Sequence, residues 1–137
     1  MSMSATLTAR LGLGTLFVLL AVCGCGGDGG VGPPVPGPLN LRLTTPNGDD
    51  GAILFEIAGG QIDSIVRAGF RLVGSAPGTS PRRAIIHGNL AAGTVARIWV
   101  PDVNSAESYS ATIRDVAARG TYALRDLQGY RIEVVKP

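Results

Sequence analysis

The stretch TVARIWV, residues 94–100, decides the fold because its side chains alternate in character along the chain. One set is apolar and consists of Ala96, Ile98 and Val100. The other set is mixed and consists of Val95, Arg97 and Trp99. A period of two places such sets on opposite faces of a β-strand, with the apolar set on a core. Because Pro101 and Asp102 then end the pattern, we expect a half-buried strand over residues 94–100.

Similar short stretches lie on both sides of this strand, separated by turns rich in Gly, Pro, Asn and Asp. We expect further strands at residues 39–44, 52–57, 64–68, 70–73, 84–87, 109–113 and 130–135. Residues 116–127 are ambiguous, and we interpret them mostly as loop. Short strands at roughly ten-residue spacing are typical of a β-sandwich. The sequence therefore predicts an all-β fold, a single small antiparallel β-sandwich over residues 39–137.

The order of elements in the C-terminal half resembles the layout of cohesin-like, Ig-like β-sandwiches of bacterial surface proteins. A glycine turn, the strand at 94–100, a second strand and a long excursion precede a glycine and the last strand at 130–135. The resemblance is one of layout and includes no diagnostic motif. It implies a binding or scaffold module and assigns a role to no residue.

The N-terminal segment differs in kind from the rest of the chain. Residues 1–10 are mostly polar and end in Arg10, and residues 11–22, LGLGTLFVLLAV, form an uncharged and mostly apolar run. Its length lies within the range of about 7–15 residues for the core of a signal peptide. A membrane-spanning helix needs about 20 residues, so the run is short for a span. We therefore predict that residues 1–24 are a signal peptide.

Residues 22–25, VCGC, resemble the lipobox of bacterial lipoproteins, in which a small residue precedes the lipidated cysteine. The resemblance implies that Cys25, which follows Gly24, carries the lipid, whereas Cys23 fits less well because Val22 is bulky. It also implies an exported protein held at the cell envelope by several acyl chains such as palmitate, which together anchor stably. A residue other than Asp after the cysteine favours the outer membrane, if the organism has one. The alternatives are an ordinary cleaved signal peptide and an uncleaved anchor helix.

Residues 26–38, GGDGGVGPPVPGP, consist mainly of Gly and Pro. Because such a composition supports no core, we assign residues 25–38 to the lipidated cysteine and a tether. No cysteine follows Cys25, so we expect neither a disulfide nor a thiolate metal site in the domain. The net charge of +2 is too small for a nucleic-acid-binding surface.

Candidate residues for catalysis or metal binding are few, and we expect no catalytic site, cofactor or metal. His87 is the single histidine and has no nucleophile motif around it, so we expect it at an exposed rim. Two loops are acidic, with Asn47, Asp49 and Asp50 in one and Asp102, Asn104 and Glu107 in the other. Neither loop has the EF-hand spacing of a calcium site. We therefore interpret both as turns whose side chains bond local backbone amides.

Other charged residues allow alternatives that the sequence does not rank. A glycoside hydrolase needs two carboxylates that face each other across a cleft, and Glu56 with Asp63 is one of many such pairs. Arg82 and Arg83 lie beside a loop, and we expect them to be solvated charges at a strand edge.

Trp99 is the sole tryptophan and shares a predicted face with Arg97. If both faces of its strand are covered, Trp99 belongs to the core, which is the interpretation that we favour. If that face is open, Trp99 and Arg97 form a contact surface. The function we expect is a membrane-anchored, non-catalytic binding or scaffold module, whose partner is an envelope protein or a glycan. The alternative is a small envelope hydrolase or an accessory subunit of an enzyme.

Overall fold

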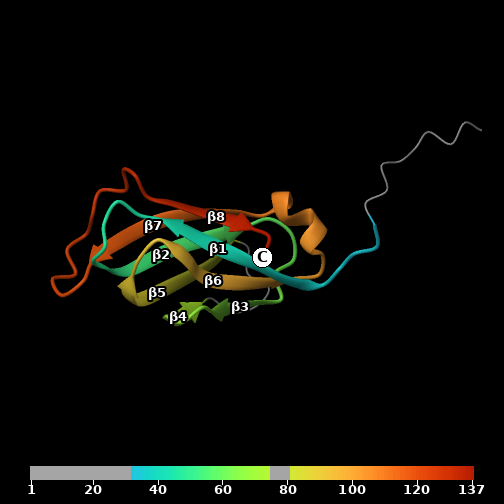
Figure 1. Ribbon diagram of the computed structural model, residues 1–137, viewed down its shortest axis with the longest axis horizontal. Helices are drawn as coiled ribbons and strands as arrows, with labels where there is room; N and C mark the ends of the chain where they lie inside the picture. Colours follow the sequence, from blue (N-terminus) through green and yellow to red (C-terminus); the bar gives the residue numbers. More distant parts are fainter. Residues whose placement is uncertain (1–31, 75–80) are drawn as a thin grey trace, which may run out of the picture. The chain divides into compact units, whose positions relative to one another are not determined.

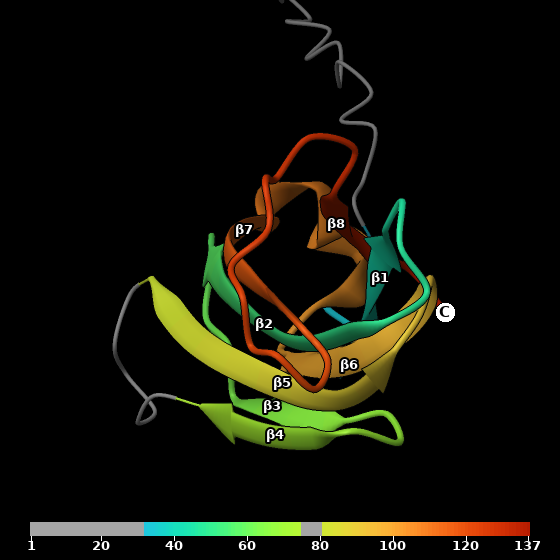
Figure 2. The same ribbon diagram turned by 90° about the vertical axis from the view of Figure 1, so that its left-hand side faces the viewer.

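The computed structural model describes residues 32–74 and 81–137, which form two four-stranded sheets packed against each other (Figure 1, Figure 2). The predicted all-β sandwich is therefore confirmed. In chain order the elements are β1 (Gly37–Thr44), β2 (Asp50–Ala58), β3 (Ser64–Arg67), β4 (Arg71–Gly74), β5 (Arg82–Leu90), β6 (Gly93–Val100), the 3-10 helix η1 (Val103–Ser108), β7 (Ser110–Ala118) and β8 (Arg131–Val135). Sheet A has the strand order β3-β6-β1-β8 and sheet B has the order β4-β5-β2-β7. All strand pairs are antiparallel.

Each predicted strand is present, and several run further than the sequence pattern, with β5 and β7 the most extended. β5 continues through Gly88 to Leu90, and β7 continues to Ala118. The extension of β7 pairs with β2 up to Ala118, and Ala117 also forms an isolated antiparallel bridge with Leu124 of the following loop. The beginning of the ambiguous stretch 116–127 is therefore strand rather than loop. Helix η1 was not predicted.

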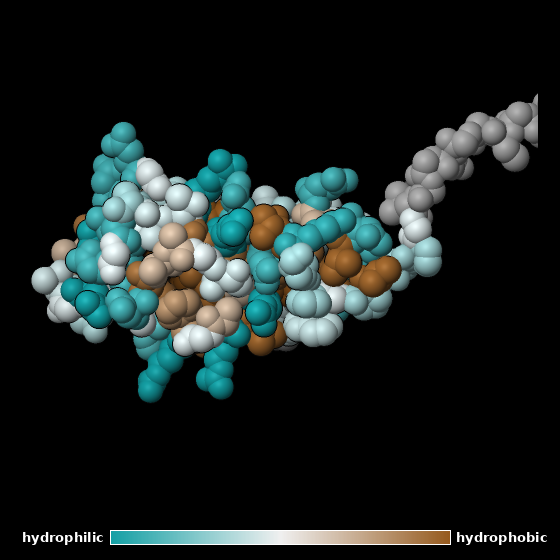
Figure 3. Space-filling view, in the orientation of Figure 1, coloured by the Kyte–Doolittle hydropathy of each residue, from teal (hydrophilic) through white to brown (hydrophobic). Residues whose placement is uncertain are grey.

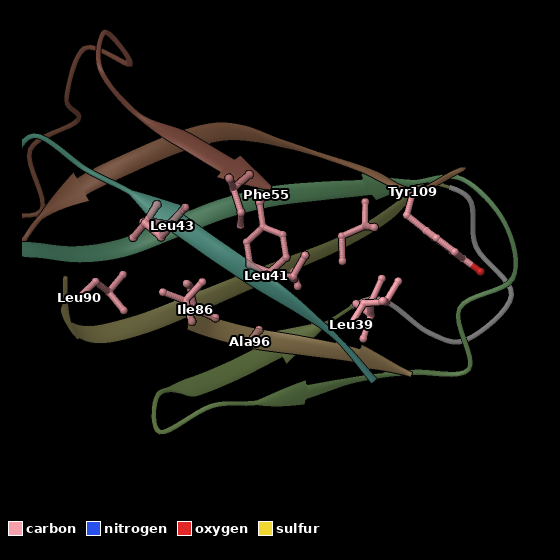
Figure 4. Close-up of a cluster of buried hydrophobic side chains, with 14 of the residues drawn as sticks. Leu39, Leu41, Leu43, Phe55, Ile86, Leu90, Ala96 and Tyr109 are labelled. Carbon is pink, nitrogen blue, oxygen red and sulfur yellow. The ribbon is translucent and has the colours of Figure 1, made fainter. Parts of the chain in front are cut away.

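The core lies between the two sheets and is built from alternate residues of the strands (Figure 4). Its largest contributors are fully buried, namely Leu39, Leu41 and Leu43 of β1, Ile53, Phe55 and Ile57 of β2, Ile86 and Leu90 of β5, and Val95, Ile98 and Val100 of β6. Burial of an aliphatic or aromatic side chain of this size contributes about 1.5–3 kcal/mol. The alternation of apolar residues in the sequence therefore reflects which side chains face this core.

A β-bulge in sheet A changes the expected placement of Val95. Leu41 of β1 pairs with Ala96, but the next residue of β1, Arg42, pairs with Thr94, so Val95 is the extra residue. An extra residue bends the strand locally and breaks the alternation of side chains. Val95 is therefore fully buried, and the prediction that it shares the outer face with Trp99 is wrong.

The chain enters the sandwich just before β1. The predicted signal peptide, both candidate lipidation cysteines and the tether up to residue 31 lie outside the described residues. Strand β1 begins at Gly37, two residues earlier than expected. Before it, Val35 already contacts the domain, because its N–H donates to Asp102 Oδ1 at 3.1 Å and its carbonyl accepts from the Val103 N–H at 2.9 Å. Over residues 32–74 and 81–137, no helix is long and apolar enough to cross a membrane.

Candidate contact surface

Trp99 lies on the outer face of sheet A, where 45% of its surface is exposed. Its cross-strand neighbours are Pro38 of β1 and Ser64 of β3, so Trp99 is on an inner strand of the sheet, at the end where β1 begins. The residues on either side of it in β6, Ile98 and Val100, are fully buried. The interpretation of Trp99 as a core residue is therefore wrong, and the predicted sharing of a face with Arg97 holds.

Arg97 lies two residues before Trp99 on the same face. It pairs across the sheet with Asn40 of β1 and Val66 of β3, and its Nε donates to Asn40 Oδ1 at 3.2 Å. Arg42 follows two residues after Asn40 and is also exposed. We call the group of Pro38, Arg42, Val66, Arg97 and Trp99 the contact face.

The contact face combines three kinds of interaction in one place. The indole offers a flat apolar surface with a polar N–H, and Val66, 39% exposed, extends the apolar area. The guanidinium groups add donors that suit phosphate or carboxylate oxygens. Figure 3 shows hydrophobic residues at the end of the molecule where the chain enters, and Val35, which precedes β1, is 49% exposed. Such a surface is suited to contact and carries no group positioned for bond-breaking chemistry.

Glu56 forms an ion cluster on the outer face of sheet B that the sequence did not reveal. Arg83 of β5 stands directly opposite Glu56 in the ladder and its Nε donates to Oε1 at 2.6 Å. From the other side, Arg114 of β7 donates to Oε2 through Nη2 at 2.6 Å and Nε at 2.9 Å. The two arginines cover the carboxylate, and their hydrogen bonds, Arg114 first, hold its pKa below the ordinary value. Glu56 is thus a structural group that stays ionised at neutral pH.

We expect the Glu56 cluster to make stability depend on acid pH. Because its pKa is lower in the folded chain than the ordinary 4.5, the stabilisation is complete above 4.5 and is lost as the pH falls through the folded-state pKa. Urea unfolding at a series of pH values from neutral to strongly acid should therefore show a steeper acid loss for the native chain than for Glu56→Gln. Parallel pH profiles for the two proteins would contradict this assignment.

Arg83 is solvated as we expected, with 68% of its side chain exposed, but Arg82 is not. Strand β5 lies between β4 and β2, so neither residue is on an edge strand. Arg82 is buried, and its Nη1 donates to the Ile62 carbonyl oxygen at 3.0 Å. The arginine therefore ties the segment before β3 to the core of sheet B.

The acidic loop at residues 47–50 is a structural network rather than a local turn motif. Asp50 is fully buried and accepts hydrogen bonds from Tyr130 Oη at 2.7 Å and Thr45 Oγ1 at 2.5 Å, while Arg125 Nε lies 3.1 Å from its Oδ1. Asn47 Nδ2 donates to the Tyr130 hydroxyl at 2.6 Å. Burial and the bond to Asp50 both raise the pKa of Tyr130. These bonds reach side chains far along the chain, so the expectation of bonds to local amides is wrong for Asp50.

Asp102 caps the start of η1, as the turn interpretation predicts. Its Oδ1 accepts from the backbone N–H groups of Val35 and Asn104, and these two bonds lower its pKa. Over the described residues, no cluster of three or more His, Cys, Asp or Glu side chains is arranged to hold a metal ion.

The structure does not bring the other candidate residues into a catalytic arrangement. His87 is exposed as expected, but it lies within β5, opposite Ala52 of β2 and Arg71 of β4. Glu56 belongs to sheet B, whereas Asp63 lies beside sheet A, where its N–H donates to the Trp99 carbonyl oxygen at 2.9 Å. Glu56 and Asp63 thus do not form a facing pair.

A groove of about 470 Å³ runs between the edge strands β7 and β8, which belong to different sheets. Its lining includes Ile113, Leu127 and Ile132, and its single carboxylate is Glu133, which pairs with Arg131 at 2.6 Å. A glycosidase site needs two carboxylates at a fixed separation. The lining that the structure describes does not provide such a pair.

Comparisons with models of known protein families, with curated proteins and with solved structures find no match to this chain. The resemblances to a lipobox and to cohesin-like layouts therefore stay predictions. The geometry of the contact face is the main guide to function.

Proposed function

We propose that this chain is a lipid-anchored, non-catalytic binding module of the cell envelope, and that it meets another envelope component through the contact face. The observation that carries this proposal is the exposure of Trp99. Tryptophan is enriched at the energetic centres of interfaces, where it supplies a large apolar area with one polar handle. In this chain the sole tryptophan lies outside the core, next to Arg97.

The anchor half of the proposal is supported by the sequence at the N-terminus. The apolar run at residues 11–22 and the small residue before Cys25 fit an exported lipoprotein. Lipid on Cys25, or less favourably on Cys23, would hold the domain at the envelope membrane. In an organism with an outer membrane, we propose that membrane as its location.

The alternative function, a small envelope hydrolase or an accessory subunit, gains no specific support from the described residues. Glu56 is held as a carboxylate by Arg83 and Arg114, so it is not suited to the role of a general acid. His87 stands opposite Arg71 in the ladder between β5 and β4. A histidine that serves as a general base needs an orienting acid instead.

Photo-crosslinking in intact cells tests the proposal. A benzophenone-bearing residue placed at position 99 of the full-length protein should form covalent adducts with an envelope component on irradiation. The matched control is the same residue at position 122, because Tyr122 is also an exposed aromatic, at 72%, but lies in the loop after β7. We expect adducts at position 99 in clear excess over position 122. If position 99 gave no adducts, or no more adducts than position 122, the proposal that the contact face meets an envelope component would be wrong.

A further inference from the structure

Pro38 and Trp99, which form one end of the contact face, lie at the end of the sandwich where the chain enters, and Arg97 and Arg42 follow along the sheet towards its other end. Gly37 and Pro38, the first residues of β1, pair with Val100 and Trp99 at the end of β6. The loop after β7 lies at the opposite end (Figure 1), where the Arg119 N–H donates to the Asp49 carbonyl oxygen at 2.8 Å. Trp99 is therefore close to the point from which the chain leads back to Cys25.

The length of the tether limits how far this end can lie from the lipid. The backbone of Val35 is held to the domain by two hydrogen bonds, one with the Asp102 side chain and one with the Val103 N–H, so residues 26–34 are the part of the chain between lipid and domain. At about 3.3 Å per residue, these residues span at most about 30 Å in any conformation. The opposite end of the sandwich is further away by the length of β1, roughly 26 Å for its 8 residues. Tethering at this range raises the effective concentration of the membrane at the entry end.

The chemistry of the contact face fits the headgroup layer of a bilayer. Tryptophan prefers the interface between water and lipid, where its ring is in apolar surroundings and its N–H stays wet. Arginine places its stem along apolar surface while its guanidinium binds phosphate. Within the described part of the chain, Glu133 stands opposite Arg42 in the ladder but pairs with Arg131, and neither Arg42 nor Arg97 forms an ion pair. Both remain able to bind lipid phosphates.

We propose that the contact face rests on the membrane that holds the Cys25 lipid, with Trp99 in the interface and Arg42 and Arg97 at lipid phosphates. This inference deepens the proposed function, on which it rests, by naming the envelope component as a lipid surface. The domain then turns the outer face of sheet B away from the bilayer. That face carries Val73 and Ile85, which are 63% and 42% exposed.

Trp99 is the sole tryptophan, so its fluorescence reports on this face alone. The full-length lipidated protein, extracted from membranes, is reconstituted into vesicles of phosphatidylcholine and phosphatidylglycerol with or without brominated acyl chains. We expect Trp99 to lose most of its emission in the brominated vesicles. In the control Trp99→Phe/Tyr122→Trp, the indole is at the opposite end and should keep its emission. Arg42→Gln/Arg97→Gln should weaken the quenching without releasing the protein from the vesicles.

Flotation of the vesicles tests the lipid anchor separately from the docking of the contact face on the membrane. If the protein does not float with the vesicles, the lipid anchor is absent, and the proposed function and the docking both fail. If it floats but bromine does not quench Trp99, the docking alone is overturned. Equal quenching at positions 99 and 122 also overturns it, since no particular face is then in contact. The docking fails as well if Trp99 emission responds to an added envelope polysaccharide or protein but not to brominated lipid.

Discussion

Replacing Phe55 by alanine is expected to lower the free energy of unfolding by about 3–5 kcal/mol. The ring is fully buried and projects from β2 into the space between the sheets, towards the leucines of β1 (Figure 4). The structure around a vacated core site relaxes only partially, so a cavity remains and adds to the loss. Because a domain of this size has a total stability of about 5–15 kcal/mol, the variant would lose a large part of it. Urea unfolding followed by circular dichroism measures the difference.

The matched control for Phe55→Ala is Val73→Ala. Val73 is an apolar strand residue like Phe55, but it lies on the outer face of sheet B and is 63% exposed. Substitutions at such sites change stability by about 0.5 kcal/mol or less. If Phe55→Ala were as mild as Val73→Ala, the core between the sheets would not be where the structure has it.

Replacing Asp50 by alanine is expected to cost about 3 kcal/mol, at the lower end of the range for breaking a buried ion pair. Asp50 is fully buried and holds the hydroxyls of Tyr130 and Thr45 together with Arg125. Its removal leaves these hydroxyls without their acceptor in a site that water does not reach freely. The cost stays at the lower end because the Arg125 side chain is 21% exposed and keeps its second carboxylate, Asp49. Urea unfolding of the purified variant gives the value.

Asp49→Ala is the matched control for Asp50→Ala, since both carboxylates bind the same arginine. The Asp49 side chain is 60% exposed, and exposed ion pairs contribute about 0–1 kcal/mol. We therefore expect a clear difference between two neighbouring aspartates. Equal losses of stability would show that the buried network is not what secures the C-terminal loop.

Alternation, together with short runs bounded by Gly- and Pro-rich turns, predicted every strand of the sandwich, because burial between two sheets selects alternate residues. It could not predict the bulge at Val95, since a bulge depends on how β6 pairs with β1. The alternation also could not predict that Trp99 is exposed. Alternation assigns a residue to a face, but whether another layer covers that face is a property of the whole fold.

The polar networks were hidden for a related reason. Asp50 and Tyr130 are 80 residues apart in the chain, and Glu56 and Arg114 are 58 apart. Their contacts follow from the strand order and register, which local patterns do not specify. Acidic residues in a Gly-rich turn usually bond to the local backbone. Here Asp50 instead contacts Tyr130 and Arg125, which are near the C-terminus.

The most direct test of the account is the mass of the mature protein extracted from the cell membrane. We predict a chain that begins at Cys25 and carries the additional mass of several acyl chains. Cys25→Ala should abolish this modification, whereas Cys23→Ala should leave it intact. An unacylated protein that retains residues 1–24 would contradict the account.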